Sequence, residues 1–283
     1  MHQPTAKPAY PHILQRTIRF ALNPNNSILG NNTFAGKPTI SGLGRYYEIT
    51  IAIKGLPNPH TGYLIGIQEI DAIVRDHLLP LIADQIATAP NTHPGTLMPQ
   101  FWNTLTRSIN HTLQSINWQL TPYHTIEMST DIPHTQPPNT VLIRQRFEFA
   151  AAHRLHTPTM SDDENKAYFG KCNNPSGHGH NYQLEPAIRI PVDLLTSRDY
   201  QIEIEQAVNS TLLDQLDHKF LNTDCPWFDQ TQGGVIPSIE NIARICYEQL
   251  EPAIANITPR IKLVSMTAWE TQKTSSIYPA DAH

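Results

Sequence analysis

The sequence predicts an α+β protein made of two similar units in tandem, residues 1–128 and residues 141–283. Alternating apolar residues indicate strands, and apolar residues spaced three or four apart indicate helices. The order of these strands and helices in the first half returns in the second half. A polar, proline-rich segment, residues 129–140, separates the halves and is typical of a linker. The alternative is one mixed α/β domain with an order repeated by chance, but the similarity extends to the loops and favours duplication.

In the first half, two helices are expected to follow two strands in the sequence and to precede a closing strand. Residues 16–22 and 45–55 are strand-like, and the second of these runs alternates clearly between apolar and other residues. Residues 67–82 carry an apolar stripe at helical spacing, and residues 101–109 indicate a second helix. Residues 116–128 are expected to form the closing strand.

The second half is expected to follow the same order. Ser238 follows a proline and precedes an apolar stripe, so it is a candidate N-cap for the second helix. The expected elements are strands over 141–153 and 178–192, helices over 204–216 and from 239 to 250, a strand over 261–271 and a final strand over 275–278.

Composition excludes several function classes. The net charge of −5 gives no basic footprint for nucleic acid. No run of apolar residues reaches the ~18 that a membrane span needs. The three cysteines are an odd and sparse set, which indicates a reducing compartment rather than a disulfide framework. We therefore expect a soluble cytoplasmic protein.

The segment FGKCNNPSGHGHNY contains a candidate metal site. His178 and His180 are two residues apart on an expected strand, so their side chains point to one face. His153, near the end of the preceding strand, would add a third nitrogen if the two strands form a hairpin. Three imidazoles suit a catalytic zinc with an open fourth position. However, the chain has 14 histidines, so a lone His-x-His can arise by chance, and Cys172 fits either a fourth ligand or a neighbouring base.

Five segments in order carry a family resemblance: FAAAHRLH, FGKCNNPSGHGHNY, LDHKFLN, PSIEN and AWET. Together they resemble the 6-pyruvoyltetrahydropterin synthase family, which includes the 6-carboxytetrahydropterin synthases of queuosine biosynthesis. The resemblance covers roughly residues 141–279. It implies the tunnelling fold, a ββααββ unit with an antiparallel sheet and two helices. In that fold three units form a barrel, two barrels stack head to head, and active sites lie between units.

The resemblance also implies a role for each matching residue. It places zinc ligands at His153, His178 and His180, a catalytic group at Cys172, Asp217 and His218, and pterin contacts at Glu270, Ser238 and Glu240. A carboxylate such as Glu270 can accept both neighbouring N–H groups of a pterin. A cation near Cys172 would favour the thiolate, which then acts as a base. Asp217 would orient His218, as a carboxylate does in a catalytic triad.

The first half resembles the family much less. Its counterpart of HGHNY is LGRYY, which places Leu43 and Arg45 at ligand positions. The counterpart of LDHKF is LIADQ, and His124 is aligned approximately with Glu270. We interpret the first half as a degenerate copy that has kept its fold and lost its chemistry.

The resemblance implies a zinc-dependent lyase. The expected reaction converts 7,8-dihydroneopterin triphosphate to 6-pyruvoyltetrahydropterin with elimination of triphosphate. The carboxy-forming reaction, which releases acetaldehyde, is the alternative, and the five-residue gap between Cys172 and His178 favours the pyruvoyl product. A second alternative is a pterin-binding scaffold without activity. Because the family assembly has six units and this chain supplies two, we expect a homotrimer.

Overall fold

The computed structural model describes residues 10–23, 28–29, 40, 42–130 and 138–280, and its fold is α+β. The chain separates into two compact units. Unit 1 comprises residues 1–141 with 192–198, and unit 2 comprises residues 142–191 with 199–283. Most of the expected linker, residues 131–137, lies outside the described residues.

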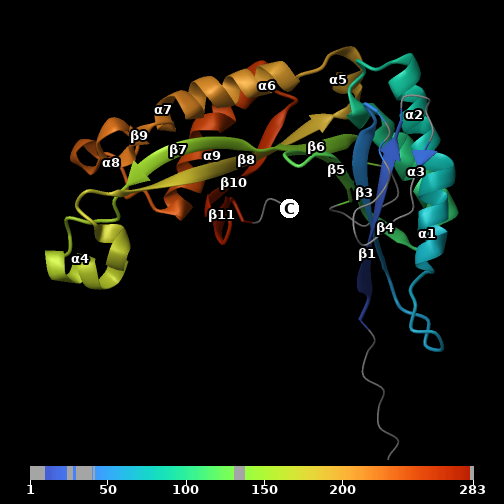
Figure 1. The fold of residues 1–283 in the computed structure, drawn as a ribbon, viewed down its shortest axis with the longest axis horizontal. Coiled ribbons are helices and arrows are strands. Elements are labelled where there is room, and N and C mark those ends of the chain that lie inside the picture. Colours follow the sequence, from blue (N-terminus) through green and yellow to red (C-terminus); the bar gives the residue numbers. More distant parts are fainter. Residues whose placement is uncertain (1–9, 24–27, 30–39, 41, 131–137, 281–283) are drawn as a thin grey trace, which may run out of the picture. The chain divides into compact units, whose positions relative to one another are not determined.

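Unit 1 is an antiparallel sheet with helices on one face (Figure 1). Its strands follow the order β2-β1-β3-β4-β5 across the sheet. The strands are β1 (His12–Leu22), β2 (Ile28–Leu29), β3 (Arg45–Gly55), β4 (Thr112–Thr121) and β5 (His124–Ser129). The helical segments are α1 (Ile67–Ile73), the π-helical η1 (Val74–Leu78), α2 (Leu79–Thr88), the 3-10 turn η2 (Pro94–Leu97) and α3 (Met98–Ser108). A further helix, α5 (Val192–Ser197), packs against η2 and belongs to this unit.

Two expectations for unit 1 need correction. The closing strand expected over 116–128 is a hairpin of β4 and β5, because Pro122 and Tyr123 form a turn between them. Proline lacks the N–H that an interior ladder position must donate, which accounts for the break. The helix expected over 67–82 is divided by the π-helical turn η1. Strand β3 has the expected bounds, and Ile49, Ile51 and Ile53 are completely buried as the alternation predicted.

Unit 2 is also a sheet with helices on one face, antiparallel except for the short parallel pairing of β7 with β9 (Figure 1). Strand β8 pairs with β6, β7 and β10, and β11 pairs with the outer side of β10. The strands are β6 (Thr140–Gln145), β7 (Phe147–His153), β8 (His178–Pro191), β9 (Lys219–Phe220), β10 (Lys262–Thr271) and β11 (Thr274–Tyr278). The helical segments are α4 (Asp162–Phe169), η3 (Gly170–Asn173), α6 (Gln201–Val208), the π-helical η4 (Asn209–Leu213), α7 (Asp214–Leu216), α8 (Leu221–Asp224), η5 (Gln230–Gln232) and α9 (Ile239–Ile257).

The strand expected over 141–153 is interrupted at Arg146, which separates β6 from β7. The guanidinium of Arg146 pairs with Glu185, with 3.0 Å between Nε and Oε2, and lies 4.6 Å from the ring centre of Trp269. These contacts fix the side chain of Arg146, the residue between the end of β6 and the start of β7. Within the described ranges, no helix combines the length and the apolar character needed to cross a membrane.

Helix α9 packs its apolar stripe on β10 and β11. Ser238 is its N-cap, as predicted, and its hydroxyl accepts a hydrogen bond from the backbone N–H of Asn241. The buried stripe consists of Ile239, Ile242, Ala243, Ile245, Cys246, Leu250 and Ile254. This stripe holds the start of α9, and with it Pro237, against the sheet.

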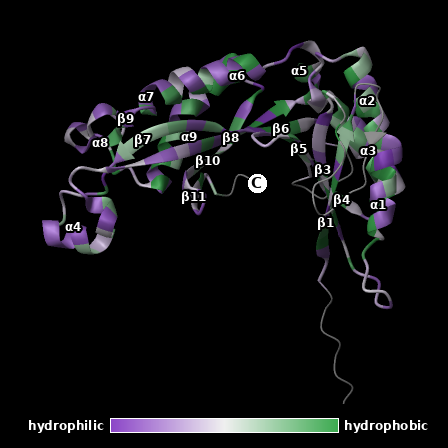
Figure 2. Cartoon of the chain, in the orientation of Figure 1, coloured by the Kyte–Doolittle hydropathy of each residue, from purple (hydrophilic) through white to green (hydrophobic). Residues whose placement is uncertain are grey.

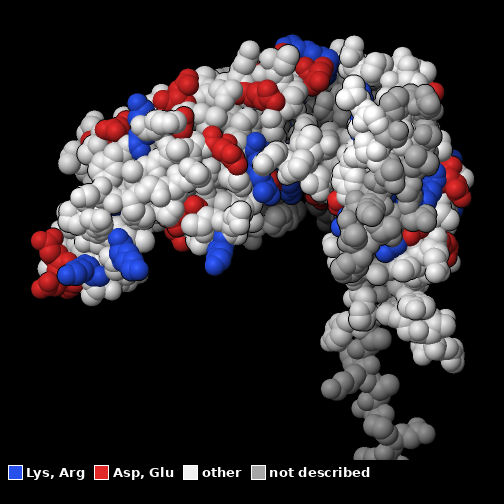
Figure 3. Space-filling model, viewed as in Figure 1, with Lys and Arg blue, Asp and Glu red and all other residues white. Residues whose placement is uncertain are grey.

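The connection between β7 and β8 forms a small hydrophilic subdomain around α4 (Figure 2). Acidic residues gather at the start of α4 and basic residues lie close by (Figure 3). Ser161 and Glu164 form a capping box there. The buried amide of Asn165 donates to the carbonyls of Thr157, Met160 and Ser161. The connection is therefore an ordered segment, and it carries Cys172.

Candidate metal centre

The β7–β8 hairpin brings the three predicted histidines together. Its register places His153 directly opposite His178, and Ala151 opposite His180. Residues opposite each other and residues two apart share one face of a sheet. All three imidazoles therefore lie on the same face, as the hairpin prediction required.

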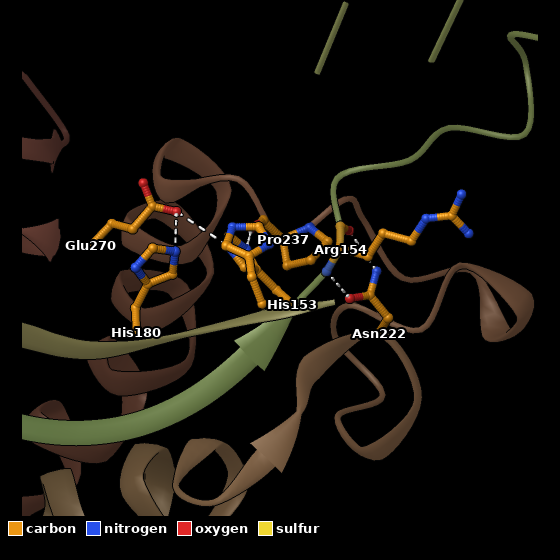
Figure 4. A network of polar contacts seen from close by, with 7 residues as sticks. His153, Arg154, His180, Asn222, Pro237 and Glu270 are labelled. Carbon is orange, nitrogen blue, oxygen red and sulfur yellow. Dashed lines mark hydrogen bonds and ion pairs between the residues drawn. The ribbon is translucent and has the colours of Figure 1, made fainter. Parts of the chain in front are cut away.

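Four side chains converge at this point: His153, His178, His180 and Glu270, which stands near the end of β10 (Figure 4). One ligand atom from each lies within 4.8 Å of all the others. The Nε2 atoms of His153 and His178 are 3.1 Å apart, and Glu270 Oε1 lies 3.1 Å from His153 Nε2 and 3.4 Å from His180 Nε2. The sequence predicted the three histidines as a set and assigned Glu270 to the substrate, so the closeness of Glu270 to the imidazoles was not foreseen.

The hydrogen bonding of His153 supplies the test of whether this group fits a metal ion. His153 is completely buried, and its Nδ1 lies 2.7 Å from the carbonyl oxygen of Pro237. A carbonyl only accepts, so Nδ1 carries a proton and donates it, and Nε2 is the ring atom that faces His178 and Glu270. Two imidazole nitrogens and a carboxylate oxygen this close together can share a proton or hold a metal ion. His180 Nε2 is also buried without a hydrogen-bond partner. Three imidazole nitrogens and a carboxylate therefore fit a zinc-type ion.

The charges of the site agree with metal binding. Burial lowers the pKa of His178 and of His180, so both rings are neutral and can offer lone pairs. The close contact with His153 and the neighbouring imidazoles lower the pKa of Glu270, which is therefore an anion. The stacked apolar ring of Tyr182 lies below the group, edge-on to His153 and His180 at 5.8 and 5.5 Å between centroids.

The segment that carries Cys172 is hydrogen-bonded to the chain just after His153, the last residue of β7. Its carbonyl accepts the backbone N–H of Leu155 at 2.8 Å, and the side chain of Asn173 donates to the carbonyl of Leu155 at 2.7 Å. The thiol is half-buried, and burial and the negative charge of Glu270 raise its pKa. The protein groups alone thus favour the thiol, and a thiolate requires positive charge in the site.

The structure does not bring Asp217 and His218 into the cluster. They form a pair at the edge of β7: Asp217 Oδ1 accepts the N–H of Ala150, and Asp217 Oδ2 lies 2.8 Å from His218 Nδ1. The side chain of His218 is 84% exposed, and its backbone has a positive φ of 56°. Left-handed backbone costs about 1–2 kcal/mol outside glycine, so the hydrogen bonds to Ala150 fix an otherwise unfavourable conformation.

Ser238 and Glu240 lie at the start of α9. The hydroxyl of Ser238 caps the helix, and Glu240 is exposed. Between these motifs the sequence analysis missed two positioning groups (Figure 4). Pro237 orients His153 through its carbonyl, and Asn222 bonds both the N–H and the carbonyl of Arg154, the residue after His153. Both residues lie in motifs that the sequence analysis used, Pro237 in PSIEN and Asn222 in LDHKFLN. Their positioning roles could not be recognised there, because any residue type can supply a backbone carbonyl.

The two glycines beside His178 differ in their roles. Gly177 has a φ of 71°, and a Cβ there would lie 2.7 Å from Cε2 of Phe220 and 3.2 Å from the carbonyl oxygen of His153. A Cβ on Gly179 would lie 3.6 Å from the carbonyl oxygen of Ala151, an ordinary contact. The backbone is therefore closely approached at Gly177 and not at Gly179.

The strand registers identify the corresponding positions in unit 1. Glu48 pairs with Gln119 on β4 as Gln183 pairs with Trp269 on β10, so Arg45 and His180 occupy comparable positions on β3 and β8. Leu43 lies before β3, so its match to His178 stays a prediction, as does the duplication itself. Both following hairpins contain a bulge, which makes Leu120 the counterpart of Glu270 and His124 the counterpart of Thr274. The assignment of His124 to the Glu270 position was wrong, because His124 lies on β5, beyond the turn at Pro122 and Tyr123.

Comparisons with known proteins identify relatives of the second half. The family model described as 6-pyruvoyl tetrahydropterin synthase matches residues 142–281. The 6-pyruvoyl tetrahydrobiopterin synthase of Poecilia reticulata is 34% identical over 131 residues, 46% of this chain and 84% of that protein. That of Drosophila melanogaster is 40% identical over 117 residues, 41% of this chain and 67% of that protein. The solved structure of Caenorhabditis elegans 6-pyruvoyl tetrahydropterin synthase is 34% identical, covers 51% of this chain and 98% of its own, and gives a TM-score of 0.45.

Proposed function

Because the chain belongs to the 6-pyruvoyl tetrahydropterin synthase family, we propose that unit 2 is a zinc-dependent lyase that converts 7,8-dihydroneopterin triphosphate to 6-pyruvoyltetrahydropterin. The observation that carries the proposal is the convergence of three imidazoles and Glu270 around one point. Bound there by His153, His178 and His180, zinc would act as a Lewis acid on the substrate side chain and acidify its C–H groups.

Glu270 is proposed to hold the pterin rather than the metal. A catalytic zinc keeps one position open, and a fourth protein ligand would close it. As an anion near the three histidines, Glu270 can accept paired N–H groups of the pterin and so orient the ring beside the metal. Glu270→Gln should then retain zinc and lose substrate affinity, whereas loss of zinc would make Glu270 a ligand.

Cys172 is proposed as the group that moves the proton. It lies on the ordered connection beside His153, and a cation in the site offsets the effects of burial and of Glu270 on its pKa. Ser238 and Glu240, at the start of α9, are proposed to contact the pterin.

Incubation of the zinc-loaded protein with 7,8-dihydroneopterin triphosphate tests the function directly. Mass spectrometry should find 6-pyruvoyltetrahydropterin, and phosphate analysis should find free triphosphate. Acetaldehyde among the products would instead assign the carboxy-forming reaction. Full zinc occupancy without any triphosphate release would favour a pterin-binding scaffold.

Asp217 and His218 are proposed to act in the site of a neighbouring chain within a homotrimer. The location of the two residues supports this proposal, because the pair lies outside the metal cluster of its own chain and His218 is highly exposed. The corresponding segment of unit 1 contains Ile82 and Ala83, which cannot relay protons, so each unit 2 would need another unit 2 beside it.

Mixed assemblies test this arrangement. Cys172→Ala and His218→Ala chains, each inactive alone, are dissociated, mixed and reassembled. Sites formed between two different chains should recover part of the activity, because one chain supplies the intact thiol and the other the intact imidazole. A molar mass other than that of three chains, or no recovery in verified mixed trimers, would contradict the proposal.

A further inference from the structure

The chain segment at the start of helix α9 contains a further layer of hydrogen bonds behind the metal centre. His153 donates its Nδ1–H to the carbonyl of Pro237, with 2.7 Å between the two atoms (Figure 4). Pro237 is buried, and its two neighbours are bonded to each other across it. The backbone N–H of Ser238 donates to the carbonyl of Ile236 at 2.9 Å. The carbonyl that orients His153 therefore belongs to a three-residue turn.

The planar peptide bond links the two carbonyls of this turn. The C=O of Pro237 and the N–H of Ser238 belong to one trans peptide unit, in which they point in opposite directions. Because the N–H is directed at Ile236, the Pro237 carbonyl is directed away from Ile236 and towards His153. The proline ring also fixes φ of the central residue at about −65°. A group that holds the carbonyl oxygen of Ile236 thus helps to set the direction of the hydrogen bond to His153.

Asn241, in the first turn of α9, holds that oxygen. Its side-chain amide nitrogen donates to the carbonyl of Ile236 at 2.9 Å. Its amide oxygen accepts from the guanidinium of Arg244 at 3.3 Å, and Arg244 is fixed in turn by Glu248, with 2.9 Å from Nη1 to each carboxylate oxygen. Since the amide oxygen is occupied, the nitrogen is the atom that faces Ile236. The helix cap does not need this bond, because the hydroxyl of Ser238 already accepts the backbone N–H of Asn241.

We propose that Asn241 is a positioning residue of the metal centre, which acts on His153 through the turn at Pro237. The proposal rests on the metal site of the proposed function and concerns how the protein orients one ligand, not which reaction follows. Removal of the group that orients a metal-bound imidazole typically weakens metal binding by roughly 10–100-fold. Asn241 acts one hydrogen bond further from the ring, so its loss should weaken zinc binding by a smaller factor, about three- to tenfold.

The first readout is the zinc affinity of the full chain, measured by competition with a chelator that changes colour on binding zinc. Asn241→Ala should show the three- to tenfold loss. Asn241→Leu, which keeps the branched shape of asparagine without its N–H, should show the same loss. Asn256→Ala is the matched control at the exposed far end of the same helix and should keep the parent affinity. Ser238→Ala removes the N-cap and should lower the unfolding midpoint, but it should keep the zinc affinity because both bonds to the Ile236 carbonyl remain.

The second readout is the ring N–H signal of His153, recorded by NMR on metal-free protein labelled with ¹⁵N-histidine. A buried Nδ1–H that is bonded to a carbonyl exchanges slowly with water, so it should give a resolved signal that His153→Gln identifies by its absence. Asn241→Ala should broaden this signal through faster exchange, whereas Ser238→Ala and Asn256→Ala should retain it. This readout needs no zinc, so a parent protein that binds no zinc would contradict the proposed function while the ring signal still decides the role of Asn241.

An unchanged ring signal of His153 in both Asn241 variants overturns the proposal. Unchanged zinc affinity of these variants, in a parent protein that binds zinc, overturns it as well. Equal losses in Asn241→Ala and Ser238→Ala would also overturn it, because the effect would then come from a loosened start of α9 and not from the bond to Ile236. Circular dichroism of each variant confirms that unit 2 is folded under the conditions of the two measurements.

Discussion

Gly177, immediately before His178, offers a sharp test of how the backbone positions the metal centre. Its φ of 71° lies in the left-handed region, which costs alanine about 1–2 kcal/mol. The added Cβ would also lie 2.7 Å from Phe220 and 3.2 Å from the carbonyl oxygen of His153, and moving those groups adds about 1–2 kcal/mol. The smaller entropy of the unfolded alanine chain offsets about 0.4–1 kcal/mol. Gly177→Ala should therefore destabilise unit 2 by about 1–3 kcal/mol.

Gly179→Ala is the matched control on the other side of His178. Gly179 has no positive φ, and a Cβ there meets only an ordinary contact at 3.6 Å. Alanine should therefore be neutral or should stabilise by about 0.4–1 kcal/mol. The two variants differ from the parent by the same methyl group, so their opposite signs depend only on local backbone geometry.

Urea unfolding followed by circular dichroism, together with zinc analysis of the dialysed proteins, measures both consequences. Gly177→Ala should lower the unfolding midpoint and also weaken zinc binding, because Phe220 and His153 must shift beside His178. Gly179→Ala should retain the unfolding midpoint and the zinc binding of the parent protein. Equal midpoints and equal zinc contents in the two variants would refute the reasoning.

Three further outcomes are expected. His178→Ala and His180→Ala should each lose zinc and activity together, by metal analysis and product assay, and unchanged metal content in both would exclude the site. Cys172→Ala should retain zinc and fold but lose turnover by ~10²–10⁴-fold, whereas loss of its zinc would make Cys172 a ligand. The N–H of Ala150 and the ring of His218 lower the pKa of Asp217 from its ordinary value, so its stabilising contribution is present at neutral pH and is lost as the pH falls through that lowered pKa. The stability difference between the parent and Asp217→Asn should accordingly shrink in unfolding measurements as the pH falls through the lowered pKa, and a difference that stays constant in acid would contradict this origin.

Side-chain periodicity and spacing made much of the fold predictable. The alternation of residues 45–55 gave the bounds of β3, and Ser238 marked the start of α9. The failures have local causes that periodicity does not register. Arg146 interrupts a run that reads as one strand, and Pro122 turns another into a hairpin. The same unrecognised turn at Pro122 led to the wrong counterpart of Glu270, because His124 lies beyond it on β5.

The histidines of the candidate site were predictable because all three lie on paired strands, where spacing determines the face. The groups that orient them were not. Pro237 acts through a backbone carbonyl and Asn222 through contacts to the backbone of Arg154, and both come from segments far along the chain. Such positions depend on tertiary packing, so the sequence could indicate the ligand set but not the tautomer that makes His153 competent.

The two units carry different chemical groups at comparable strand positions. In unit 2, His180 and Glu270 contribute a ring nitrogen and a negative charge to the metal cluster. In unit 1, the positions with the same strand register hold Arg45 and Leu120. A guanidinium stays protonated and has no lone pair for a metal, and leucine has no carboxylate. The side chains at these positions in unit 1 therefore offer no ligand to zinc, although the strands pair in the same way.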